Sequence, residues 1–173
     1  RASVCAIQKV KIGPQGESVI HSVIRDVRPR GICGSGYIDI IATLLDAGLL
    51  DKSGKMNAGT SKRVRETETG NEFVIAFKEE ADCRGDIVIT EADIENLKRS
   101  KAAIYSATVI LAKHMGLDLS RIKKFFIAGG FGTFLDMENS VRIGLLPDLQ
   151  REKFVFIGNS SLAGARQVLL SFE

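Results

Sequence analysis

KKFFIAGGFGTFLD, residues 123–136, joins a short apolar run to a turn that contains three glycines. The run Phe125–Ala128 has the length and the boundaries of a buried strand. A helix-like segment with Asp136 near its start follows the glycines. A strand, a glycine turn and a helix in this order present backbone amides at the carboxyl edge of an α/β sheet, where phosphate and ribose groups bind. Residues 123–136 therefore predict an α/β fold with a candidate ligand site at the turn.

Gly129, Gly130, Phe131 and Gly132 form this turn. Glycine tolerates a positive φ angle and has no Cβ atom to hold a ligand away from the backbone. The strict G-x-G-x-x-G spacing of a dinucleotide-binding turn is absent, however. A tight strand-to-helix connection that binds no ligand is therefore the alternative interpretation of these four residues.

The amino-terminal part of the chain predicts a hairpin. Residues 3–12 and 18–27 are strand-like, and residues 13–16 between them are turn formers. Pro29 disfavours helix at the residue before it and ends the strand region. Residues 31–36 then form a second glycine-rich loop.

A helix follows this second loop. Ser35 is a candidate for its cap, and Gly48 supplies its end. The apolar residues of the helix lie on one side, as a helix packed on a core requires. Asp39 falls in the first turn, where a carboxylate complements the helix dipole. A supporting role near a nucleotide or Mg²⁺ is the alternative for Asp39.

The middle of the chain predicts a second hairpin between two loops. Its strands are residues 63–65 and 73–77, and the exposed loops are residues 51–62 and 78–85. Residues 87–89 form a short strand that leads into a long helix.

The long helix is predicted from Glu91 to about Met115, and Gly116 ends it. Thr90 and Asp93 have the spacing of a capping box, with Asp in place of the usual Glu or Gln. Six residues recur at helical spacing as its buried stripe: Ile94, Leu97, Ile104, Thr108, Leu111 and Met115. Lys101 interrupts this stripe, and a lysine there can extend its ammonium group to water.

Residues 153–171 repeat the strand, glycine and helix pattern, with a strand at residues 154–157. Strands that alternate with helices after amino-terminal hairpins predict an α/β fold with a mixed sheet and flanking helices. The length of 173 residues suits a single domain, residues 1–173.

Composition excludes several classes of protein. With 45% hydrophobic and 26% charged residues, the sequence is typical of a soluble globular domain. The net charge of +3 is mild, and the sequence shows no gathered basic face for nucleic acid. No apolar run reaches membrane-spanning length and no secretory signal is present. Because the first residue is Arg1 rather than methionine, we expect a fragment or a processed product.

The titratable residues predict no catalytic or metal-binding site. Cys5, Cys33 and Cys83 are too far apart for a C-x-x-C pair, and their odd number favours reduced thiols in a cytoplasmic protein. The sequence holds no Ser-His-Asp order, no H-E-x-x-H and no P-loop lysine motif.

Residues 127–132, IAGGFG, resemble the adenosine motif of the actin, Hsp70 and sugar-kinase ATPase superfamily. Three stretches more narrowly resemble the carboxyl-terminal ATPase domain of the reductive activators of corrinoid proteins. They are RGICGSGYID at residues 30–39, the Gly129 region with GLLPD at residues 144–148, and GNSSLAGA at residues 158–165. The order and spacing of these stretches match across nearly the whole chain.

The resemblance implies one lobe of a ribonuclease-H-like, actin-like ATPase domain. It implies ATP and Mg²⁺ as ligands of the complete protein, a [2Fe–2S] cluster in another domain, and a corrinoid methyl-carrier protein as the partner. The implied activity is ATP-dependent return of cob(II)alamin to cob(I)alamin. Candidate nucleotide contacts are Gly129, Gly130, Phe131, Gly132, Gly34, Ser35, Gly36, Ser100 and Lys101.

The sequence departs from the family pattern in what it lacks. It has no ferredoxin-type cysteine cluster and neither of the superfamily's two phosphate loops. We therefore expect the chain to supply the adenosine side of an ATP cleft and to be inactive alone. One alternative is an activator of the 2-hydroxyacyl-CoA dehydratase type, because Cys33-Gly34-Ser35-Gly36 is similar to its cluster-binding loop. The other is a non-catalytic docking or dimerisation module. Besides the corrinoid protein, a second copy of the chain in a homodimer is a candidate partner.

Overall fold

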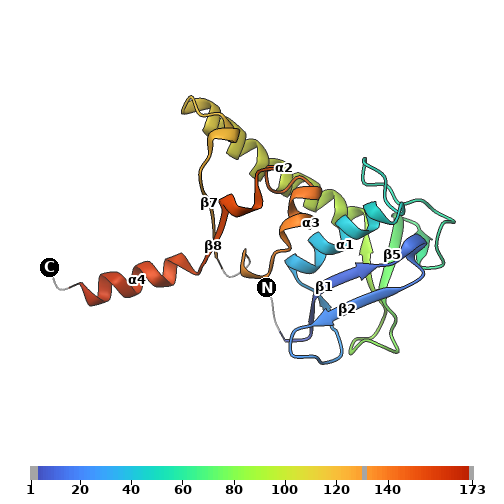
Figure 1. Ribbon diagram of the computed structural model, residues 1–173. Coiled ribbons are helices and arrows are strands. Elements are labelled where there is room, and N and C mark those ends of the chain that lie inside the picture. The colour runs from blue at the N-terminus through green and yellow to red at the C-terminus, as the bar shows by residue number, and fades with distance from the viewer. Residues whose placement is uncertain (1–3, 130–131, 172–173) are drawn as a thin grey trace.

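The computed structural model describes residues 4–129 and 132–171 (Figure 1). Within these residues the strands form three sheets, in the orders β2-β1-β3, β4-β5-β6 and β7-β8. The predicted mixed α/β architecture is confirmed, because the first sheet contains both antiparallel and parallel pairs. Four short 3-10 helices connect larger elements: Pro14–Gly16, Leu119–Arg121, Gly132–Phe134 and Arg151–Lys153.

The first sheet carries the predicted amino-terminal hairpin. Strands β1 (Ala6–Ile12) and β2 (Val19–Val23) pair antiparallel, and β3 (Gly31–Ile32) pairs with β1 in parallel. Helix α1 (Gly34–Asp46) packs on β1 and ends before Gly48, whose φ of +71° allows the chain to leave the helix. The predicted loop at residues 31–36 is wrong, because its first two residues form β3 and its last three begin α1.

The second sheet is antiparallel and supports the long helix. It contains β4 (Val64–Thr67), β5 (Gly70–Ala76) and β6 (Ile87–Thr90). Helix α2 (Glu91–His114) begins directly after β6. Its capping box is confirmed, because the Thr90 side chain accepts from the Asp93 amide and the Asp93 carboxylate accepts from the Thr90 amide.

The third sheet joins β7 (Phe125–Ala128) and β8 (Phe154–Gly158) in parallel. Helices α3 (Met137–Arg142) and α4 (Ser160–Leu170) follow these strands. The β7 strand is confirmed, but its predicted burial is wrong, because Phe126 is 58% exposed and the other three residues are exposed or half-buried. Figure 1 shows α4 extending away from the other elements toward the carboxyl terminus.

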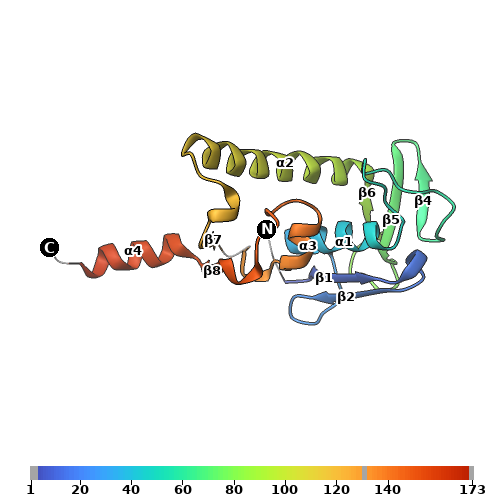
Figure 2. The ribbon, with the colours of Figure 1, turned by 45° about the horizontal axis from the view of Figure 1, so that its top comes forward.

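The core lies between β1, α1, β5, β6 and the first turns of α2. Its fully buried large side chains include Ile7, Ile38, Leu44, Phe73 and Ile94. The predicted stripe of α2 is buried only in its first half. Beyond that half α2 extends past α1 and α3 toward the start of β7 (Figure 2), and Ile104, Leu111 and Met115 are more than half exposed. Among the described residues, no helix combines the length and apolar character needed to cross a lipid bilayer.

Candidate functional site

The carboxyl ends of β7 and β8 meet at two glycines. The Gly129 amide donates a 2.6 Å hydrogen bond to the Gly158 carbonyl, and both residues have positive φ angles, +100° and +63°. Asp136 and Asn159 then cap α3 and α4, each by accepting from a backbone amide of the first turn. Two parallel strands therefore end at neighbouring glycines at one sheet edge, and a capped helix follows each strand in the chain.

Gly129 and Gly132 occupy different surroundings within the turn. Among the described residues other than its chain neighbours, no atom lies within 4 Å of a Cβ atom added at Gly129, so this part of the structure leaves room for a ligand. A Cβ atom at Gly132 would lie 2.7 Å from Ile127 Cγ2, so Gly132 is required for packing. Gly130 and Phe131 lie outside the described residues. Whether this turn contacts a nucleotide stays a prediction.

Gly34, Ser35 and Gly36 form the first turn of α1, and two of the three are used for packing. The Ser35 hydroxyl is buried and donates to the Gln8 carbonyl at 3.0 Å, so its predicted capping role is wrong. Cys33 occupies the cap position without a side-chain hydrogen bond. A Cβ atom at Gly36 would lie 2.5 Å from the Ile7 carbonyl oxygen. These contacts hold the start of α1 against β1, while Gly34 is exposed.

Asp39 is the one buried charged residue in the described part of the chain. Its carboxylate accepts from Asn139 Nδ2 at 2.7 Å and from the Val10 amide at 3.3 Å. Burial raises the pKa of Asp39 above its ordinary value, although both hydrogen bonds act in the opposite direction. Asp39 thus connects β1, α1 and α3, and α3 is the helix that follows the Gly129 turn.

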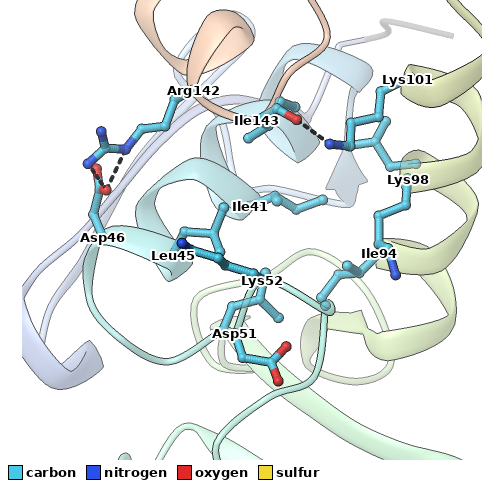
Figure 3. A pocket seen from close by; sticks show the side chains of 13 residues that line it. Ile41, Leu45, Asp46, Asp51, Lys52, Ile94, Lys98, Lys101, Arg142 and Ile143 are labelled. Carbon is cyan, nitrogen blue, oxygen red and sulfur yellow. Dashed lines mark hydrogen bonds and ion pairs between the residues drawn. The ribbon is translucent and has the colours of Figure 1, made fainter. Parts of the chain in front are cut away.

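A pocket of about 680 Å³ lies between α1, α2, α3 and the loop after α1 (Figure 3). Its walls are apolar side chains of α1 and α2, with charged groups at the rim. Lys98 Nζ donates to the Ser53 carbonyl at 2.6 Å and to Glu95 at 2.8 Å. Arg142 pairs with Asp46 on the opposite side. The pocket therefore combines an apolar interior with a rim of basic and acidic groups.

Lys101 lines this pocket, and Ser100 does not. Lys101 Nζ donates to the Ile143 carbonyl at the end of α3, where a cation complements the helix dipole. The exposed Ser100 hydroxyl donates back to the Asn96 carbonyl in its own helix. The lining residues of the pocket also include none of the glycines of the two predicted loops.

Sequence reasoning missed Lys98 and Arg142 as pocket residues. The spacing of Lys98 and Lys101, three residues apart on one helix, could have indicated a shared face. Nothing in the sequence places Arg142 near them, because its position depends on how α3 packs on α1.

Comparison with known proteins gives one family and several relatives. Residues 1–173 match the family model described as the C-terminal domain of RACo, the ASKHA domain. The corrinoid activation enzyme RamQ of Eubacterium limosum is 35% identical over the whole chain, which covers 30% of that protein. A [Co(II) methylated amine-specific corrinoid protein] reductase of Methanosarcina barkeri is 29% identical over 81% of this chain and 22% of its own length.

A solved structure of a reductive activator for a corrinoid, iron-sulfur protein superposes with a TM-score of 0.93. It is 47% identical over 99% of this chain, which covers 27% of that chain. The present chain therefore spans less than a third of the length of each of these three relatives.

Proposed function

The chain belongs to the family of RACo C-terminal ASKHA domains, and from this we propose that it forms the adenosine side of an ATP cleft in a reductive activator of corrinoid proteins. The complete protein would return the cobalt of a corrinoid methyl carrier from Co(II) to Co(I), with ATP as the source of free energy. The family match over all 173 residues carries this proposal. The names of the three relatives support it, because one is called a corrinoid activation enzyme and the other two a reductase and a reductive activator of a corrinoid protein.

The Gly129 turn fits a nucleotide. Its backbone has the positive φ angle that glycine allows, and no described atom beyond its chain neighbours fills the space beside Gly129. It lies where two parallel strands end, the usual place for ligands in α/β folds. In the proposed site this backbone approaches the adenosine, together with Gly130, Phe131 and Gly132.

Asp39 and Lys101 have positioning roles in this proposal. Asp39 fixes α3 to α1 through Asn139, so the turn before α3 is held in a defined place. Lys101 fixes the other end of α3 to α2 through the Ile143 carbonyl. Gly34, Ser35, Gly36, Ser100 and Lys101 stay candidate contacts.

The described residues do not fit a metal ion or an iron-sulfur cluster. They contain no group of three or more His, Cys, Asp and Glu side chains that could hold a metal ion. Bound ATP would bring Mg²⁺ to its phosphates. The carboxylates that hold this ion and the cysteines that hold a cluster are proposed to lie outside these 173 residues.

The dehydratase-activator alternative requires Cys33 to bind a cluster. In the described structure the Cys33 thiol is buried and lies 3.1 Å from the Ser35 hydroxyl. This arrangement favours a packing role for Cys33, so we retain the corrinoid activator as the proposed function.

Photolabelling of the intact protein tests the placement of the adenosine. 8-Azido-ATP carries its reactive group on the base, and a γ-phosphate azidoanilide of ATP carries it at the other end. We expect ATP-protected labelling by the first reagent within residues 91–136 and by the second outside this chain. Base labelling that ATP suppresses but that maps elsewhere would overturn the proposal.

A further inference from the structure

The end of α2 and the start of β7 form an exposed surface with an unusual composition. Leu117, Arg121, Lys123, Lys124 and Phe126 surround a shallow pocket of about 560 Å³. Phe126 is 58% exposed and Leu117 is 47% exposed, and the three cations are also exposed. We call these five residues the 117–126 surface.

The segment 113–126, which includes this surface, has the same net charge as the whole chain. Residues 113–126 include four Lys and Arg residues and one acidic residue, Asp118, which gives a net charge of +3. The whole chain also has a net charge of +3, so the other residues are neutral in sum. Lys153 adds a further cation, because its Nζ donates to the Ser120 carbonyl at 2.9 Å.

The cations of the surface are available to a partner. Within residues 4–129 and 132–171, Arg121, Lys123 and Lys124 form no ion pair. The Asp118 carboxylate accepts from the Ser120 amide at 2.8 Å and caps the short helix there, so it is already engaged. An arriving carboxylate would therefore meet three cations that form no ion pair in the described structure, although Asp118 lines the same pocket near Arg121.

The exposed apolar residues of the surface, Leu117 and Phe126, indicate that its partner is a protein. Exposed aromatic and aliphatic side chains next to basic groups are typical of the centre of a protein interface. A second copy of this chain does not fit, because a two-fold interface here would place like charges opposite each other. The surface fits an acidic protein face that carries some apolar area.

Resting on the proposed function, we propose that the 117–126 surface docks an acidic face of the corrinoid protein. Electron-transfer partners associate briefly through small interfaces, and complementary charge raises their association rate. The surface lies at the amino end of β7, and the Gly129 turn lies at its carboxyl end. One strand of four residues, about 13 Å long, therefore joins the docking surface to the proposed nucleotide turn.

A direct binding measurement tests this surface independently of ATP chemistry. The corrinoid protein is immobilised and the intact activator is the analyte, at several salt concentrations. We expect Lys123→Glu/Lys124→Glu to weaken binding at least about tenfold at low salt, mainly through the association rate, and to flatten the salt dependence. The matched control Lys11→Glu/Lys62→Glu changes the same number of exposed lysines on other elements and should bind like the wild type. Phe126→Ser should increase the dissociation rate.

Three results would overturn the docking proposal. The first is unchanged binding by the charge-reversed variant. The second is a lower melting temperature for that variant but not for the control, which would show that the rest of the polypeptide covers this surface. The third is competition by a short duplex DNA, which would assign the surface to nucleic acid. Failure of the proposed function would give a different result from these three. The wild-type activator would bind the corrinoid protein but would not reduce it when ATP is added.

Discussion

Asp39 shows how one buried carboxylate can organise the region around the candidate site. Its two donors come from β1 and from α3, which lie 29 and 100 residues away in the sequence. Burial disfavours the charged form, and the hydrogen bonds compensate for this only in part, so the pKa of Asp39 is raised. The predicted first-turn position of Asp39 is wrong, because α1 begins at Gly34 and its first turn contains no acidic residue. Nothing in the sequence indicated the partner Asn139, because only the packing of α3 brings it to α1.

Asp39 makes a specific contribution to the pH dependence of stability. A carboxyl group whose folded-state pKa is raised contributes stability below its unfolded pKa and loses it as pH rises through the folded value. We therefore expect the unfolding free energy of the wild type to fall, relative to Asp39→Asn, as pH rises above the ordinary Asp value of 3.8. Denaturant titrations of both proteins between acidic and neutral pH measure this difference. If the unfolding free energy of the wild type stayed constant or increased relative to that of Asp39→Asn as pH rises, the raised pKa would be contradicted.

Gly129→Ala separates backbone strain from ligand contact. A Cβ atom at positive φ costs roughly 1–2 kcal/mol. Gly48→Ala is the matched control, because Gly48 also has a positive φ angle and open space beside it. We expect both variants to lose comparable stability, which thermal melting of the intact protein measures. We expect only Gly129→Ala to bind ATP more weakly, which equilibrium dialysis measures. Equal ATP affinity in the two variants would make the Gly129 turn a structural connection only.

At the scale of elements, local signals predicted most helices and strands. Turn residues located both hairpins, and the capping box with Gly116 located both ends of α2. Burial was predicted less well, because it depends on what lies opposite an element. The apolar stripe of α2 continues beyond the elements that cover its first half, and β7 has a described strand on only one side.

The same limit applies to the candidate site. The Gly129 turn could be predicted from the sequence, because the apolar run and the glycines that define it are adjacent in the chain. Residues 31–36 contain similar glycines, yet Gly36 serves the close approach of α1 to β1. Sequence alone cannot separate a glycine required by a ligand from one required by a neighbouring strand, since both need the absence of a Cβ atom.

Thr90→Ala tests how much the capping box contributes to α2. The substitution removes the hydroxyl that accepts from the Asp93 amide at 3.1 Å. We expect a loss of about 1 kcal/mol of stability, measured by denaturant unfolding. Thr90→Ser keeps the hydroxyl and should retain most of that stability. A loss for Ser as large as for Ala would assign the effect to the methyl group instead.

At the scale of the whole molecule, large apolar side chains are exposed on several elements at once. Outside the 117–126 surface they occur on and just after the second half of α2, on β8 and on α4: Ile104, Ile110, Leu111, Met115, Phe156, Ile157, Leu162, Val168, Leu169 and Leu170. Single exposed apolar residues are ordinary, but so many together indicate contact with other protein. This agrees with a proposed role as one part of a longer activator.

The 173-residue chain by itself is therefore expected to hydrolyse no ATP above background and to bind adenine nucleotides weakly. Catalysis of phosphoryl transfer depends on charges positioned around the γ-phosphate, and these are proposed to lie elsewhere. Phosphate release with and without Mg²⁺ measures this. Turnover by the chain alone that stops when Mg²⁺ is removed would contradict the expectation.

We also expect the purified chain to contain no iron. Its cysteines do not gather with other ligands in the described structure. Anaerobic preparation followed by iron analysis and absorbance spectroscopy measures this. A cluster absorbance that disappears in Cys33→Ala would instead favour the dehydratase-activator alternative.

The most direct test of the central claim is the cobalt oxidation state of the corrinoid protein, followed by absorbance under anaerobic conditions with the intact activator and a reductant. We predict that cob(I)alamin forms only when ATP and Mg²⁺ are present, and more slowly with Gly129→Ala than with Gly48→Ala. Formation of cob(I)alamin at the same rate with and without ATP would contradict the account.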